Sequence, residues 1–181
     1  MVRRLVLAQR LRGRRHQPRY LPRQVLASLL GAVIGFVMLG VIPSPGAPGS
    51  FGISDGHGLI VAPFGATAVL LFGNPGSPLA QPRNVVLGSG LAALVSVLCV
   101  QLLGSAPWVM GLAVGITIAL GQRLRCLHPP AGALAVVGVV QGARLSYLLF
   151  PVLPGALLMV LLAFVYHRVS GMGHRYPVHW L

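Results

Sequence analysis

The stretch Cys126-Leu127-His128-Pro129-Pro130-Ala131-Gly132 stands at the start of an apolar segment, 128–142. Proline is favoured in the first turn of a helix, where its missing N–H costs no hydrogen bond. A glycine in that turn lets a ligand or a neighbouring helix approach the backbone closely. The stretch therefore predicts the start of a helix with an accessible backbone.

The composition around this stretch is that of a membrane protein. Of the 181 residues, 55% are hydrophobic and only 8% are charged, and the mean hydropathy is +0.82. A soluble domain carries roughly a quarter charged residues because its surface faces water. We therefore expect an all-α polytopic membrane protein with the lipid bilayer as its main partner.

The charges are segregated along the chain. All 14 basic residues are arginines, Asp55 is the sole acidic residue, and the net charge is +13. Eight of the arginines precede the first apolar segment, and a block in this position touches anionic headgroups on the cytoplasmic side of a membrane. We interpret it as a cytoplasmic anchor and expect no nucleic-acid partner.

Six apolar segments follow this block. A helix needs about 20 apolar residues to cross a hydrocarbon layer of ~30 Å. Three segments meet this length, and three are shorter and rich in glycine or proline. The longer segments are 24–42, 85–103 and 146–167, and the shorter ones are 58–73, 107–121 and 128–142.

The arginines indicate how many segments cross. If all six cross with the N-terminus inside, 13 of the 14 arginines lie on the inner side, against 10 of 14 if 58–73 and 128–142 are re-entrant. The positive-inside rule favours six crossings, with four full spans and two half helices as the alternative. We expect a bacterial inner membrane and cytoplasmic termini. The predicted domains are a tail at 1–23, a transmembrane domain at 24–168 and a tail at 169–181.

An offset of 67 residues aligns two parts of the chain. Pro63-Phe64-Gly65-Ala66-Thr67-Ala68-Val69 lies over Pro130-Ala131-Gly132-Ala133-Leu134-Ala135-Val136 with five identities, and Gly88 lies over Gly155. The alignment predicts two halves of three segments each, at about 24–103 and 107–168. An odd number of crossings inverts the second half relative to the first, an arrangement typical of transporters.

The two aligned motifs form the candidate binding site. Free N–H groups and the helix dipole make a buried helix start attractive to an anion. The repeat would bring two such starts together, with the Thr67 hydroxyl and the His128 ring as further donors. The predicted site consists of Pro63, Phe64, Gly65, Ala66, Thr67, His128, Pro129, Pro130, Ala131, Gly132 and Ala133. Tight packing of small residues at two Pro-Gly helix breaks is the alternative interpretation.

Other functional classes lack their characteristic residues. The segments contain no nucleophile–base arrangement, paired carboxylate, phosphate-binding loop or metal-ligand spacing, so we expect no enzyme, cofactor or metal. Asp55 lies in the loop 43–57, so no segment carries the acid that proton- or sodium-coupled transport usually needs. A small anion is therefore the expected substrate. The alternative is a non-transporting protein that recruits lipid or another subunit through its Arg-rich tail, and a homo-oligomer is left open.

Three stretches, 62–70, 77–84 and 127–133, resemble the HPP family of integral membrane proteins, named for its His-Pro-Pro run. The similarity covers about residues 20–170. It implies four transmembrane helices and, as in some members, transport of nitrite. Ser89 departs from the family, whose members often place a histidine about here. Gln81, Arg83 and Asn84 of the second stretch are expected at the cytoplasmic mouth of a transport path, or as caps of the following helix.

Overall fold

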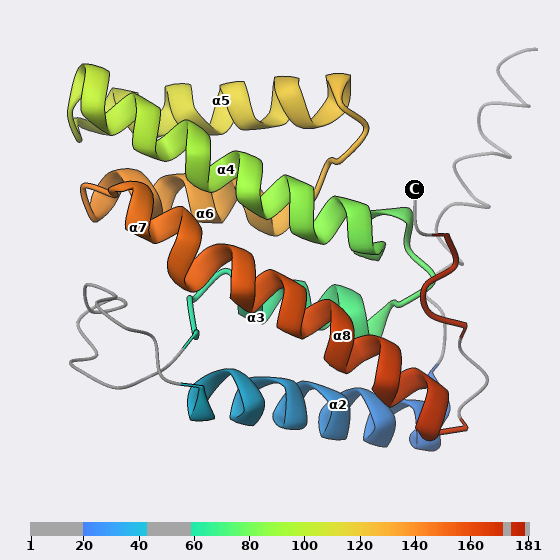
Figure 1. Ribbon diagram of the computed structural model, residues 1–181. Helices are drawn as coiled ribbons and strands as arrows, with labels where there is room; N and C mark the ends of the chain where they lie inside the picture. The colour runs from blue at the N-terminus through green and yellow to red at the C-terminus, as the bar shows by residue number, and fades with distance from the viewer. Residues whose placement is uncertain (1–19, 43–58, 172–174, 180–181) are drawn as a thin grey trace, which may run out of the picture.

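The structure, a computed structural model, describes residues 20–42, 59–171 and 175–179 (Figure 1). Every regular element within these ranges is helical, as the sequence predicted. The long elements are α2 (Pro22–Val41), α4 (Pro82–Leu103), α5 (Pro107–Arg123) and α8 (Leu153–Val169). The short elements are α3 (Phe64–Ala68), η2 (Val69–Gly73), η3 (Pro78–Ala80), α6 (Pro129–Val140), α7 (Leu145–Tyr147) and η4 (Leu148–Val152).

Prolines mark where the main helices begin. The helices α2, α4, α5 and α6 each start at a proline, whose fixed φ suits the first turn of a helix. The predicted start at Pro129 is therefore confirmed. A proline also bends the last segment, because Phe150, which precedes Pro151, leaves the helical conformation.

The helices fall into two classes of length. Pro22–Val41, Pro82–Leu103 and Leu145–Val169 are long and apolar enough to cross a membrane. By contrast, α3 and η2 have five residues each, and α6 has 12. At roughly 1.5 Å per residue, these two short runs measure about 15 and about 18 Å, against a hydrocarbon layer of ~30 Å. Their lengths match the predicted half helices, and six full crossings stay a prediction.

The helices pack in layers. In Figure 1, α4, α5 and α6 lie together in the upper part of the bundle and α2 lies at the opposite side, with α3 and α8 between them. Glycines allow the close contacts: Gly138 of α6 lies against Ser96 of α4, and Gly31 of α2 lies against Phe72. Apolar burial drives helices together only weakly in lipid, so small residues that permit close approach stabilise such a bundle.

Two of the glycine contacts are related by the predicted offset of 67 residues. On α4, a Cβ at Gly88 would lie 2.6 Å from the carbonyl oxygen of Cys126. On α8, a Cβ at Gly155 would lie 3.2 Å from the carbonyl oxygen of Leu59. In both cases a glycine on the last helix of one half contacts the backbone just before the short helix of the other half.

The predicted tails are described only in part. Residues 1–19 and the loop that contains Asp55 lie outside the described residues. In the C-terminal tail, the Tyr176 hydroxyl donates a hydrogen bond to the carbonyl oxygen of Ala80 at 3.1 Å. The Val178 N–H donates to Oε1 of Gln81 at 2.8 Å. This part of the tail therefore packs against the chain just before α4.

Candidate functional site

The two predicted motifs meet at one hydrogen bond. Thr67 Oγ1 lies 3.0 Å from His128 Nε2, although the two residues are 61 apart in sequence. Both side chains are buried, with exposed fractions of 0% and 2%. The second ring nitrogen of His128, Nδ1, lies 3.0 Å from the carbonyl oxygen of Leu79. A carbonyl oxygen only accepts, so in the neutral ring Nδ1 carries the hydrogen and the Thr67 hydroxyl donates to Nε2.

The first-turn N–H groups of both short helices already have acceptors. At the start of α3, the N–H groups of residues 64–67 donate to carbonyl oxygens of residues 61–63 at 2.9–3.2 Å. At the start of α6, Pro129 and Pro130 have no N–H, and the Ala131 N–H donates to the His128 carbonyl oxygen at 2.8 Å. The predicted cradle of free N–H groups is therefore absent at these positions, because tight turns and prolines occupy both helix starts.

The other residues of the predicted site divide between core and surface. Phe64 is fully buried and its ring contacts Gly155 of α8, so Phe64 belongs to the core. A Cβ at Gly65 would meet no atom within 4 Å, so open space borders the first motif. The structure buries Pro63, Pro130 and Ala131, leaves Gly65 and Gly132 half-buried, and exposes Ala66, Pro129 and Ala133.

Gln81, predicted at the mouth of the path, holds two loops in place instead. Its side chain is fully buried. Its Nε2 donates to the carbonyl oxygens of Pro75 and Ser77 at 3.1 and 2.7 Å, and its Oε1 accepts the N–H of Val178 from the C-terminal tail. Both ends of the amide are thus satisfied, as a buried side-chain amide requires.

Arg83 and Asn84 connect the start of α4 to the loop that leads into α6. Arg83 Nη2 donates to the carbonyl oxygen of Leu124 at 3.1 Å. Asn84 Nδ2 donates to the carbonyl oxygen of Leu127 at 2.8 Å. These bonds fix the backbone immediately before His128, so the two residues position the imidazole rather than cap their own helix.

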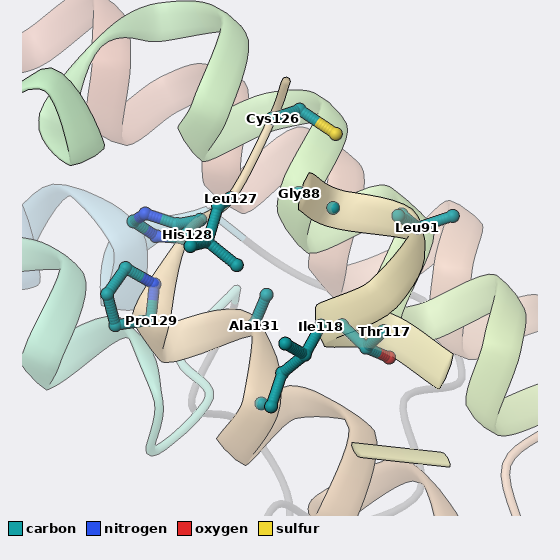
Figure 2. A pocket seen from close by; sticks show the side chains of 11 residues that line it. Gly88, Leu91, Thr117, Ile118, Cys126, Leu127, His128, Pro129 and Ala131 are labelled. Atoms are coloured by element: carbon teal, nitrogen blue, oxygen red, sulfur yellow. The ribbon is translucent and has the colours of Figure 1, made fainter. Parts of the chain in front are cut away.

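A pocket of about 330 Å³ lies between α4, α5 and α6. Figure 2 shows the imidazole of His128 turned away from Leu91 and Thr117, with Ala131 pointing toward the space between them. The pocket and the Thr67–His128 contact therefore lie on different sides of the stretch around His128. The lining residues are Gly88, Leu91, Thr117, Ile118, Gly121, Cys126, Leu127, His128, Pro129, Ala131 and Gly132.

The contribution of α4 and α5 to this pocket did not follow from the sequence. Gly88 was noticed only as part of the repeat, and Thr117 and Gly121 were not considered. Thr117 is the polar feature of this wall, because its hydroxyl is buried and has no hydrogen-bond partner among the described residues. A threonine and a glycine four residues apart on an otherwise apolar helix were the signal that could have marked this face.

Comparison with known proteins places the chain in a family. The sequence model described as "HPP, transmembrane region" matches residues 17–177. "Transmembrane protein DDB_G0269096" of Dictyostelium discoideum is 42% identical over 130 residues, which cover 67% of this chain and 45% of that protein. "Transmembrane protein DDB_G0273707/DDB_G0273361" of the same organism is 36% identical over 129 residues, which cover 67% and 41%.

The matched region spans less than half the length of these two relatives. No solved structure matches the chain. The family match covers nearly all of the described residues, including both short helices and the contact between them. The chain is therefore an integral membrane protein that belongs to the HPP transmembrane family.

Proposed function

We propose that this protein transports a small anion, with nitrite as the candidate substrate, along a path that the Thr67–His128 pair closes. The hydrogen bond at which two short apolar helices meet carries the proposal. In transporters built from inverted repeats, substrates bind near mid-membrane where interrupted helices meet. The contacts at Gly88 and Gly155, related by 67 residues, support such a repeat.

The chemistry of the pair suits an anion. The described residues contain no acidic side chain, so no fixed negative charge repels one there. The Thr67 hydroxyl is a hydrogen-bond donor, and it donates to the His128 ring in this arrangement. An anion that accepts from Thr67 must replace the ring nitrogen as acceptor. We therefore propose that the pair separates when the anion passes, and that side chains rather than free N–H groups provide its donors.

The arginines support cytoplasmic termini. Arg23, Arg83, Arg123 and Arg168 lie near the start of α2, the start of α4 and the ends of α5 and α8, which share one end of the bundle in Figure 1. Arg144 precedes α7 at the opposite end. In a bacterial inner membrane the arginine-rich end faces the cytoplasm. Reporters fused to the two termini should both show activity that is specific to the cytoplasm.

Flux through vesicles tests the proposed transport. The full chain is reconstituted into phosphatidylcholine vesicles, and nitrite entry is followed by assay of the vesicle contents. We expect nitrite to enter faster than into empty vesicles, and Thr67→Val and His128→Ala to lower the rate. Ser28→Ala is the matched control, because it removes a hydroxyl that donates to the Phe72 carbonyl oxygen at 2.9 Å, away from the pair.

The same measurement separates transport from the alternative of a membrane interaction protein. If the wild-type chain moves neither nitrite nor another small anion, the transport proposal fails. If both site variants keep the wild-type rate, the proposed site fails. Loss of cellular function on deletion of residues 1–20, without any flux, would favour recruitment of lipid or a subunit through the Arg-rich tail.

A further inference from the structure

The pocket between α4, α5 and α6 is apolar and reaches the outer surface of the bundle. Leu91, Leu127 and Ala131 contribute apolar groups to its lining. Ile118, which also lines it, is 43% exposed, and in an integral membrane protein such an apolar outer surface faces lipid. Apolar surroundings exclude a bare ion, which would lose its hydration without compensation, but they suit a hydrocarbon chain.

Three arginines stand at one end of this pocket. Arg123 ends α5 two residues after the lining residue Gly121, and Arg125 directly precedes the lining residue Cys126. Arg83 reaches the same loop through its bond to the Leu124 carbonyl oxygen. The Nε of Arg83 is buried and has no hydrogen-bond partner in the part of the chain that the structure describes. A donor on a charged group is thus left for an external acceptor.

These arginines have no acid to pair with. The described residues include no aspartate or glutamate, and the whole sequence contains one, Asp55. Arg125 has a φ of 54°, the left-handed conformation in which glycine is the usual residue after a helix. The sequence therefore keeps a positive charge at this loop although a glycine would be less strained.

We propose that the pocket binds one acyl chain of an anionic phospholipid, whose phosphate lies against Arg83, Arg123 and Arg125. The apolar lining matches the chain, and the arginines match the charge and the hydrogen-bonding geometry of the phosphate. The equivalent place in the other half is filled, because Phe64 stands where the repeat places Ala131 and contacts Gly155. This site is separate from the proposed anion path and does not depend on it.

Lipid titration tests the proposal. The full chain, purified in a mild detergent, is titrated with dioleoyl phosphatidylglycerol or dioleoyl phosphatidylcholine, and bound lipid is counted by native mass spectrometry. We expect one phosphatidylglycerol per chain to bind more tightly than phosphatidylcholine. Arg123→Gln and Arg125→Gln should each weaken that binding about fivefold. Arg144→Gln, at the opposite end of the bundle, is the matched control and should leave the binding unchanged.

Two variants test the pocket itself. Ala131→Phe should fill it as Phe64 fills the equivalent place, and should remove the preference for phosphatidylglycerol. Gly132→Leu is a second filling variant, because a Cβ there would lie 3.9 Å from Val114 Cγ1 and meets no closer atom. Thermal unfolding in lipid-free detergent identifies the variants that are folded. At least one filling variant is expected to fold and to bind less phosphatidylglycerol than the wild type.

Three results would overturn the proposal. The first is equal phosphatidylglycerol binding by the wild type, the arginine variants and a folded filling variant. The second is competition by soluble glycerophosphoglycerol at the concentrations at which the lipid competes, which would show an anion site without an acyl chain. The third is a dimer that a filling variant dissociates, which would show that a second copy of the chain occupies the pocket.

Discussion

Thr67→Val tests the contact between the two short helices most directly, because valine keeps the shape of threonine and removes only the hydroxyl. In the wild type, that hydroxyl donates to His128 Nε2 at 3.0 Å inside the bundle. The opposite ring nitrogen is held by the Leu79 carbonyl oxygen, so the ring cannot turn to find another donor without losing that bond. The variant therefore leaves a buried acceptor without a partner.

The expected cost follows from the burial of both groups. Leaving a buried polar group unsatisfied costs about 1–3 kcal/mol, and the exposed fractions of 0% and 2% leave water little access to either side chain. Such a loss lowers the folding equilibrium constant by a factor of about 5 to 150. Thr67→Ser keeps the donor, and it should recover most of the free energy of unfolding at the cost of one methyl group.

Equilibrium unfolding in mixed detergent micelles measures both variants against the wild type. We expect the order of stability to be wild type, then Thr67→Ser, then Thr67→Val. The nitrite flux of the three proteins should follow the same donor, with Thr67→Ser close to the wild type. If Thr67→Val is as stable as Thr67→Ser, the hydrogen bond does not hold the short helices together and the reasoning is refuted.

Three further substitutions test other parts of the structure. Gly88→Ala places a Cβ 2.6 Å from the Cys126 carbonyl oxygen and should destabilise the fold by about 1–3 kcal/mol, whereas Gly111→Ala, which meets open space, should not; equal unfolding midpoints would contradict the packing. Thr117→Val removes a buried hydroxyl without a described partner and should leave stability unchanged or higher; a clear loss would reveal an unseen partner. Burial raises the pKa of Tyr176 above its ordinary value of about 10. Its contact with the chain before α4 should therefore contribute fully below pH 10 and fade above it, so the stability gap to Tyr176→Phe should shrink between pH 9 and 11.

The helix starts could be predicted because their cause is local. A proline fixes its own φ, so Pro107 and Pro129 mark helix starts in the sequence and in the structure. The apolar segment 58–73 shows the limit of this reasoning, because its helix begins only at Phe64. Hydropathy does not distinguish an apolar helix from an apolar stretch that is held by its neighbours, such as Leu59 against the glycine of α8.

The candidate site could be predicted only where the repeat related its parts. The repeat placed Thr67 and His128 near each other, and the structure joins them. The engaged N–H groups depend on turn geometry that a residue pattern does not reveal. The role of Gln81 depends on Val178, which lies 97 residues further along the chain, and no local signal connects these two residues.

The two halves of the chain share their packing but differ at one position. In each half, a glycine on the last helix contacts the carbonyl oxygen two residues before equivalent points of the other half, Cys126 for Gly88 and Leu59 for Gly155. The repeat aligns Phe64 with Ala131, and the large ring fills the space that the small methyl group leaves open. Sequence identity between the halves therefore locates the shared scaffold, whereas the difference between phenylalanine and alanine decides which half has room for a ligand. A pseudo-symmetric membrane protein thus acquires an asymmetric binding surface by changing the size of one side chain on a conserved backbone contact.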